Sequence, residues 1–476
     1  MTQKSKVVLV GLAGVLAGAA MTLNFSAVAD KEASSALPIE ELRAFTEVFA
    51  RIKSDYVEPV EDKKLINEAI NGMVSGLDPH SSYLDAEGFK DLQIGTQGEF
   101  GGLGIEVGME DGFVKVVSPI EDTPAFQAGI KTGDLIVKLD DTPVKGMSLN
   151  DAVKRMRGKP GAPITLTIAR KGVDKPVVVT LVRAVIKIRS VKSKLLDDGY
   201  GYVRVTQFQE HTGELLTEAL QKLYKDNKAP LKGLILDLRN DPGGLLNGAV
   251  AVTAAFVKPD SLVVYTEGRT DDAKMRLTAS REHYLRTGQT DYLKNLPEGV
   301  KKVPMVVLVN GGSASASEIV AGALQDLKRA IVMGTQTFGK GSVQTILPLG
   351  QGTAIKLTTA RYYTPNGRSI QAKGIVPDII TEDPASTADD GFGVREADLA
   401  KHLTNNQGAE VIIVKPTPAE EDKPGSTDKP GKPDKNAKDP KDKKSTLEPG
   451  EIVSKNDYQV NQAINLLKGL QIMQTR

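Results

Sequence analysis

The sequence predicts an α/β fold for residues 186–385, because buried-type strands alternate there with amphipathic helices. The segments GLILDLRN and VPMVVLVN are nearly continuous apolar runs, which is typical of strands that are covered on both faces. The segment TGELLTEALQKLYKDN before the first of them carries leucines at helical spacing. Residues 260–300 are polar, and we place them as an insertion or a cover over the site.

Composition narrows the chemistry of this 476-residue chain, which is long enough for several domains. A formal charge of +1 gives no support to nucleic-acid binding, which usually shows as a basic excess. The chain has no cysteine, so thiol catalysis is excluded. We expect neither a metal nor another cofactor, because the histidines have no metal-ligand spacing: His80, His211, His283 and His402.

The first residues have the layout of a secretory signal peptide. Lys4 and Lys6 precede an uncharged run over residues 7–23, and Ala-Val-Ala at 27–29 is a small-residue cleavage site. We predict a signal peptide over residues 1–29. The alternative is an uncleaved anchor, because the run approaches the roughly 20 residues that span a bilayer. In both cases the remainder is periplasmic or otherwise extracytoplasmic, and an anchor would associate it with the inner membrane.

Residues 30–96 are predicted to be helical. The segment LPIEELRAFTEVFARIKSDYV has apolar residues at helical spacing, and KKLINEAINGMVSGL follows it. We favour packing or subunit contact as the role of these helices. His80 lies in the sequence Asp78-Pro79-His80-Ser81, where proline and serine indicate a turn, so we do not expect it to be catalytic.

Residues 97–185 contain short alternating strands between Gly, Pro and Asp turns, and they resemble a PDZ domain. The resemblance rests on Gly102-Leu103-Gly104-Ile105 and on the following PAFQAGIKTGDLIVKLDDTPV. Successive N–H groups in the first segment can form a nest for a peptide carboxylate, beside which the peptide adds as a strand. The resemblance therefore implies binding of a free C-terminus. Arg170, which ends the ITLTIAR strand, either couples the PDZ domain to the core or is a surface arginine.

The end of the chain changes character twice. Residues 386–450 are rich in Pro, Lys, Asp and Gly, cannot bury enough apolar surface to fold, and are predicted to be a disordered linker. Residues 451–476 form an amphipathic helix, which we interpret as a docking or oligomerisation element rather than part of the core. Together with the N-terminal helices it predicts a homo-oligomer.

The candidate nucleophile is Ser315, on the turn that follows VPMVVLVN. Ser315-Ala316-Ser317-Glu318 is also a capping-box pattern, in which the serine merely caps a helix. Three features favour catalysis. A helix N-terminus stabilises a developing anion, and the small neighbouring residues leave room for a substrate backbone. The third feature is a candidate base, which lies one strand further along the chain.

That candidate base is Lys340. The residues from Gly334 to Lys340 match the first seven positions of a phosphate-binding loop, but Gly341 stands where serine or threonine is needed. A strand-like run, GSVQTILPL, also follows instead of a helix, so we reject that loop. To act as a base, the lysine needs burial that lowers its pKa from about 10.4 toward neutrality. Gln344, on the same face of the predicted strand, is placed to hold the amine.

Taken together, residues 40–385 resemble the carboxyl-terminal processing (tail-specific) serine proteases, a family with a Ser–Lys dyad and an embedded PDZ domain. This resemblance implies that Ser315 is the nucleophile, Lys340 the general base and Gln344 its orienting partner. It also implies an oxyanion hole formed by N–H groups of Ala316 and of Gly243 or Gly244, and a ClpP/crotonase-like α/β core. The motifs that carry it are LDPHSSYL, the PDZ segments, DLRNDPGGLL, SASASEIVAGALQD, GTQTFGKGSVQ and TARYYTPNGRSIQAKGIVPD.

The expected function is that of an extracytoplasmic endopeptidase. Its PDZ domain would bind substrate C-termini, and an acyl-enzyme mechanism would process or degrade envelope proteins. Expected partners are proteins with accessible C-termini and an adaptor or activator protein. Two alternatives stay open: a non-catalytic PDZ scaffold of the cell envelope, and an acyl-CoA enzyme on the crotonase-type fold, which would need neither Lys340 nor a PDZ domain.

Overall fold

The structure is a computed structural model, and its contacts divide the chain into two units, residues 1–70 and 71–476. The predicted signal peptide and most of the predicted linker lie outside the residues that it describes. Within those residues, no helix has the length and apolar character that a membrane span requires. The described residues are 38–120, 122–173, 175–187, 189–196, 199–382, 384, 394–408 and 452–474.

The first unit contains helix α2 (Ile39–Asp55) and the first part of α3 (Asp62–Ser75). The ammonium of Lys53 pairs with the carboxylate of Asp62 at 2.7 Å, between the two helices. Helix α2, described over its whole length, buries none of its residues. Its predicted apolar side chains are consequently in solvent: Leu42, Phe45, Val48 and Ile52.

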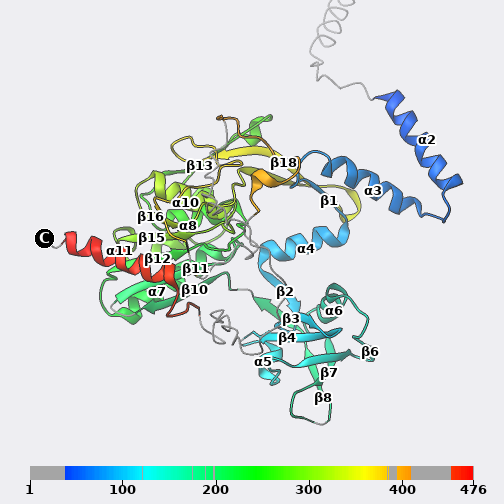
Figure 1. Cartoon of the computed structure of the whole chain (residues 1–476), viewed down its shortest axis with the longest axis horizontal. Helices are drawn as coiled ribbons and strands as arrows, with labels where there is room; N and C mark the ends of the chain where they lie inside the picture. The colour runs from blue at the N-terminus through cyan, green and yellow to red at the C-terminus, as the bar shows by residue number, and fades with distance from the viewer. Residues whose placement is uncertain are drawn as a thin grey trace, which may run out of the picture. The chain divides into compact units, whose positions relative to one another are not determined.

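The chain enters and leaves the PDZ domain through two strands that pair with each other. Strand β2 (Glu99–Gly102) pairs antiparallel with β9 (Ala184–Lys187), which explains how a domain can be inserted without disturbing the core. Helix α4 (Ala86–Gln97) precedes β2 (Figure 1). Between the paired strands lie β3 (Ile105–Glu110), β4 (Phe113–Pro119), α5 (Pro124–Gln127), β5 (Leu135–Leu139), β6 (Thr142–Pro143), α6 (Leu149–Met156), β7 (Pro163–Ala169) and β8 (Val177–Val182).

The PDZ strands form an antiparallel sheet of order β3-β4-β5-β7-β8, with β6 paired to β5. Every second residue of β7 is buried, as the alternating pattern of ITLTIAR predicts. These side chains pack with Ala152 and Met156 of α6 in a hydrophobic cluster of their own. The domain therefore has a core independent of the larger one.

The larger core, over residues 191–380, is built on a sheet of order β10-β11-β12-β15-β16-β19. All neighbours from β11 onward are parallel, and β10 adds an antiparallel edge. Helical crossovers join the parallel strands from β11 to β16, whereas the chain between β16 and β19 passes through the strands of a second sheet. The elements are β10 (Val191–Leu196), β11 (Tyr200–Val205), α7 (Thr212–Asn227), β12 (Gly233–Asp237), α8 (Leu246–Ala254), β15 (Met305–Val309), α10 (Ala316–Asp326), β16 (Ile331–Gly334) and β19 (Ile379–Ile380).

Both faces of this sheet are covered, which confirms the α/β prediction and corrects one part of it. Helices α7, α8 and α10 pack on one face. The C-terminal helix α11 (Tyr458–Gln474) packs on the other, where Leu467 lies against β12 and β15 side chains (Figure 1). For this helix the sequence predicts a docking or oligomerisation element rather than part of the core. The structure corrects that prediction: the helix belongs to the core, because an apolar strand such as GLILD needs cover on both faces.

A buried ion pair also fastens α11 to the core. The guanidinium of Arg239 donates to both carboxylate oxygens of Asp457, at 3.1 and 2.8 Å, and to Asp237 at 2.7 Å. Arg239 lies just after β12, on the way to the DPGG loop. This fork-like geometry fixes both distance and orientation.

A second, antiparallel sheet carries the segment after Lys340. Its order is β1-β18-β13-β14, with β17 paired to β18. Residues 260–300, predicted as an insertion or a cover over the site, supply two of its strands and pack against the core, which excludes a separate insertion. The elements are β1 (Ser82–Leu84), β13 (Leu262–Gly268), η2 (Asp271–Ala273), β14 (Arg276–Thr278), α9 (Arg281–Tyr284), η3 (Tyr292–Asn295), η4 (Glu298–Lys301), β17 (Ser342–Pro348), η5 (Gly350–Gly352) and β18 (Ala354–Tyr363).

Residues 394–408 lie inside the range predicted to be a disordered linker, yet they pack on the core. They include the turn η6 (Glu396–Asp398), and the side chain of Glu396 is fully buried. The segment VREADLAKHL contains regularly spaced apolar residues, unlike the Pro- and Lys-rich run that follows. Averaging composition over the whole range obscured this difference.

We expect Leu467→Ala to destabilise the core by about 2–5 kcal/mol, because it leaves a cavity under a buried helix. Met473→Ala, on the same helix and 77% exposed, is the matched control, with an effect within about 0.5 kcal/mol. Urea denaturation followed by circular dichroism measures both. If both variants unfold like the wild type, α11 is not part of the core.

Candidate active site

Ser315 occupies a strained turn between β15 and α10. Its backbone adopts φ 54° and ψ −113°, in a region that non-glycine residues seldom enter. Such strain persists only where the surrounding structure enforces it, and it concentrates at functional sites. The side chain remains partly accessible at the start of α10, where N–H groups without helical partners favour negative charge.

The carboxylate of Glu318 joins Ser315 to Lys340. Its Oε2 accepts the N–H of Ser315 at 2.8 Å and the N–H of Lys340 at 2.9 Å. Its Oε1 accepts the N–H of Gly339 at 2.7 Å and the hydroxyl of Thr337 at 2.5 Å. The capping-box glutamate therefore caps its own helix and also anchors the lysine loop. Burial raises the pKa of Glu318 to about 7, and these donors oppose that rise.

Lys340 has the electrostatic setting that a lysine base needs. Burial, and secondly the charge of Lys356, lower the pKa of Lys340 to about 8, whereas nearby carboxylates oppose that decrease. The opposing carboxylates are Glu396, Glu318 and Asp78. Among the described residues, no hydrogen bond joins the Ser315 hydroxyl to the Lys340 amine. The structure therefore brings the two residues to one carboxylate without a direct contact between their side chains.

Tyr362, on β18, lies beside both residues. Its hydroxyl donates to the carbonyl oxygen of Lys340. Burial and the charge of Glu318 raise the pKa of Tyr362 well above its usual value, and a hydrogen bond with the Ser315 side chain opposes that rise. A neutral phenol thus lies next to the candidate nucleophile, which sequence reasoning missed because β18 belongs to the second sheet.

Gln344 does not hold the lysine amine in this structure. Its amide nitrogen donates to the hydroxyls of Ser342 at 3.0 Å and Thr358 at 3.3 Å. Strand β17 begins at Ser342, so Lys340 precedes the strand that carries Gln344. The hydroxyl of Thr358 in turn donates to Asp78 at 3.1 Å, which links Gln344 to the LDPHSSYL turn.

The DPGG loop lies against the serine turn. A Cβ atom at Gly243 would approach Ala314 O to 2.6 Å and Ala316 N to 2.8 Å, so only glycine fits there, and its φ is +94°. The N–H of Gly243 already donates to Asp241 at 2.8 Å. In contrast, the N–H groups of Gly244 and Ala316 donate to no acceptor among the described residues. Of the two glycines predicted, Gly244 is the available donor.

Asp241 holds the two segments together. Its side chain accepts from Gly243, while its carbonyl accepts the N–H of Ala314 at 3.0 Å and the hydroxyl of Ser317 at 2.9 Å. The side chain is fully buried, and burial raises the pKa of Asp241 to about 7. The DPGG motif contained this residue, but the sequence did not indicate its role.

The predicted carboxylate loop of the PDZ domain has the expected backbone. Gly104 adopts φ +78°, and its carbonyl accepts from the N–H of Ile120 at 2.8 Å. The carbonyl of Leu103 accepts from Ala125 at 3.0 Å. The N–H groups of Leu103 and Gly104 find no acceptor within the part of the chain that the structure describes. The loop from Gly102 to Ile105 thus keeps donors available for a peptide carboxylate.

Arg170 is bound within the PDZ domain. Its guanidinium donates to both oxygens of Asp134 at 2.8 Å and to the carbonyl of Gly129 at 2.9 Å. Asp134 is buried, and burial by itself would raise the pKa of its carboxyl group. The hydrogen bond and charge of Arg170 act in the opposite direction, and the pKa of Asp134 is lowered overall. These bonds tie β7 to the segment before β5. They give Arg170 a role inside the domain and show no contact with the core.

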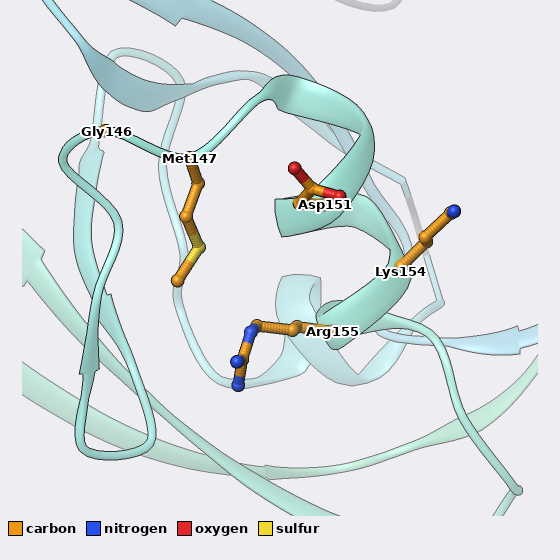
Figure 2. Close-up of a pocket in the computed structure, with 5 residues that line it drawn as sticks. All are labelled: Gly146, Met147, Asp151, Lys154 and Arg155. Atoms are coloured by element: carbon orange, nitrogen blue, oxygen red, sulfur yellow. The ribbon is translucent and has the colours of Figure 1, made fainter. Parts of the chain in front are cut away.

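A separate hollow lies beside α6. Figure 2 shows Met147 and Arg155 pointing into it, whereas Lys154 points away. Lys154 pairs with Glu87 of α4 at 2.7 Å, and Gly146 and Asp151 complete the lining. Its lining holds one acidic side chain, Asp151, and two basic ones, Lys154 and Arg155. Over the described residues, no cluster of side chains could hold a metal ion.

Family models match three parts of the chain: Peptidase family S41 over residues 199–381, PDZ domain over 101–181 and Activating protease CtpB N-terminal domain over 8–88. A carboxy-terminal-processing protease of Bartonella bacilliformis is 49% identical over 376 residues, covering 78% of this chain and 82% of the relative. The chain belongs to this family. It is a serine-type carboxy-terminal processing peptidase, which confirms the resemblance inferred from its motifs.

A second curated relative agrees with this assignment. The carboxy-terminal processing protease CtpA of Bacillus subtilis is 35% identical over 389 residues, covering 81% of this chain and 78% of the relative. Among solved structures, the photosystem II D1 C-terminal processing protease is 29% identical, with 75% of this chain and 92% of that chain covered and a TM-score of 0.40. The S41 segment contains both Ser315 and Lys340.

We expect Gly243→Ala to lower kcat by about 100-fold or more, because the added methyl group displaces the serine turn and its N–H donors. Gly288→Ala is the matched control, since Gly288 also has a positive φ, +87°, but has open space around its Cβ position. Steady-state peptidase assays of both variants test this. If both variants lose the same small amount of activity, the positive φ alone explains the loss, and the contact of Gly243 with the serine turn does not matter.

Proposed function

We propose that this peptidase cleaves by a Ser–Lys dyad, with Ser315 as nucleophile and Lys340 as general base. One observation carries the proposal: the N–H groups of both residues bind a single Glu318 oxygen, at 2.8 and 2.9 Å. The lowered pKa of Lys340, about 8, gives a useful fraction of neutral amine near neutral pH.

In this mechanism the neutral Lys340 amine takes the Ser315 hydroxyl proton as Oγ attacks the scissile carbonyl carbon. The N–H groups of Ala316 and Gly244 stabilise the resulting oxyanion. As the C–N bond breaks, the ammonium of Lys340 returns the proton to the leaving amine, and an acyl-enzyme remains. Water, deprotonated by the same lysine, then hydrolyses the ester and restores the serine.

The PDZ domain supplies the specificity for C-termini in this proposal. The N–H groups of Leu103 and Gly104 bind the substrate carboxylate, and upstream residues extend along β3 by strand addition. Substrates are therefore proteins whose C-termini are accessible and unstructured.

We further propose that the enzyme acts outside the cytoplasm, on envelope proteins. The charged start, uncharged run and Ala-Val-Ala site over residues 1–29 support this proposal. Cell fractionation with protease-accessibility mapping tests it, and recovery of the full-length protein in the cytosol would contradict it. Substrates trapped by Ser315→Ala in that compartment would identify the natural targets.

A homo-oligomer formed through α2 is the proposed assembly. The exposed apolar face of this helix, including Leu42 and Phe45, needs a partner, and a second copy of the chain supplies a matching face. Helix α11 is not available for contact between copies of the chain, because its apolar side is buried in the core. Light scattering of Phe45→Glu against the wild type tests the assembly. If the wild type is instead monomeric, this face binds an adaptor rather than a second copy of the chain.

We expect Ser315→Ala and Lys340→Ala each to lower kcat by at least about 1,000-fold on an unfolded protein substrate. Both variants should still bind peptide C-termini, because the PDZ domain has its own core. Gel-based cleavage assays and peptide-binding titrations measure the two properties. Retained cleavage by either variant would rule out the dyad, and a wild type that binds without cleaving would favour the scaffold alternative.

A substrate peptide with an amidated C-terminus should be cleaved with kcat/KM lower by about 10-fold, because it loses charge-assisted hydrogen bonds to the carboxylate loop. The matched control is the same peptide with an acetylated N-terminus, which leaves the C-terminus free. Competition with a short free-acid peptide should inhibit the unmodified substrate. Identical rates for amide and acid would contradict carboxylate capture.

A further inference from the structure

Glu396 is a second buried glutamate that contacts the loop that carries Lys340. Glu396 is fully buried, although it comes from the segment beyond the last strand of the core sheet. Its N–H donates to the carbonyl of Phe338 at 3.1 Å. A fully buried carboxylate requires hydrogen-bonding partners, and each of its oxygens has one.

The first partner is Gln371. Its amide nitrogen donates to Glu396 Oε1 at 2.8 Å, and its amide oxygen accepts the N–H of Gly341 at 2.9 Å. Gln371 is itself fully buried, and a Cβ atom at Gly341 would come within 2.4 Å of its backbone nitrogen. Glu396 therefore fixes the residues on both sides of Lys340, directly at Phe338 and through Gln371 at Gly341.

The second partner is His80, from the LDPHSSYL motif. Its Nε2 lies 2.7 Å from Glu396 Oε2. The N–H of His80 donates to the carboxylate of Asp78 at 2.8 Å, which fixes the turn. The same Asp78 accepts from Thr358, the partner of Gln344. This histidine, which the sequence did not favour as a catalytic residue, anchors the carboxylate behind the lysine loop.

We propose that Glu396, anchored by His80, is a positioning residue for Lys340: it fixes the loop through Phe338 and Gln371 and contributes negative charge near the amine. This inference rests on the proposed role of Lys340 as the base. It gives a role in the reaction to the segment at residues 394–408, which lies outside the part of the chain matched by the S41 family model.

The charge of Glu396 has a predictable effect on the base. It stabilises the ammonium form and so raises the pKa of Lys340, against burial and Lys356, which lower that pKa. Glu318 and Asp78 act in the same direction as Glu396. Since the neutral amine is the active form, activity rises with pH through the pKa of Lys340. Removing the charge of Glu396 must therefore move the rising limb of the pH profile to lower pH. His80 and Tyr362 are the other titratable groups around this loop.

The test compares full-length Glu396→Gln and Glu396→Ala with the wild type, using casein as an unfolded substrate from pH 6 to 10. Glu396→Gln keeps an acceptor for Gln371 but removes the charge. For Glu396→Gln we expect kcat on the high-pH plateau to stay within about threefold of the wild-type value. The rising limb of its pH profile should move to lower pH by on the order of half a unit. Glu396→Ala also removes the acceptor of Gln371 and leaves only the backbone bond to Phe338, so we expect kcat to fall about 10- to 100-fold with KM within about twofold. The matched control is Glu382→Gln, which neutralises an exposed glutamate and should leave both kcat and the profile unchanged.

Substitutions of His80 supply a rescue test. His80→Ala should lower kcat as the carboxylate loses its anchor, whereas His80→Gln, which can still donate a hydrogen bond, should restore most of it. A Glu396→Gln profile that superimposes on the wild type, while Lys340→Ala is inactive, would overturn this inference alone. An active Lys340→Ala would overturn both the inference and the proposed dyad. If Glu396→Ala does not fold, the pH profile of Glu396→Gln decides by itself.

Discussion

The buried carboxylate of Glu318 is the interaction on which the active site depends. A carboxylate with no exposure to water is tolerated only where donors surround it, and here the donors come from two different loops. The first is the strained turn at Ser315, and the second is the loop from Thr337 to Lys340. Because one carboxylate satisfies both, neither loop can move without leaving a buried charge unpaired. A residue that merely caps a helix in sequence terms thus fixes the nucleophile relative to the base.

The rest of the core supports this arrangement. The parallel sheet delivers Ser315 and the DPGG loop at the carboxyl ends of neighbouring strands β15 and β12, as expected for sites in open α/β sheets. The antiparallel sheet continues directly from Lys340 and carries Tyr362 and Lys356. Burial between these sheets lowers the pKa of the lysine, while Glu318, Glu396 and Asp78 limit how far it falls. The balance keeps the amine near the point at which a base is useful at neutral pH.

Several residues took their meaning only from contacts between distant segments. His80 and Glu396 lie 316 positions apart in the chain and 2.7 Å apart in space. Asp457 joins Arg239 across 218 positions and thereby makes α11 part of the core. Composition assigned Glu396 to a linker and α11 to an oligomerisation arm, because both follow or adjoin a polar, low-complexity run. Side-chain pairing over such separations leaves no local periodicity that a single sequence could reveal.

The sequence by itself determined the family, the α/β core, the inserted PDZ domain and the nomination of Ser315 and Lys340, because strand and helix periodicity and the glycine-rich motifs are local properties. It left two glycines as oxyanion donors and placed Gln344 on the lysine. Only the tertiary structure showed that the N–H of Gly243 donates to Asp241 and that the amide nitrogen of Gln344 donates to Ser342 and Thr358. Which donor meets which acceptor depends on how the two sheets pack, and that is fixed by the whole core rather than by any one segment.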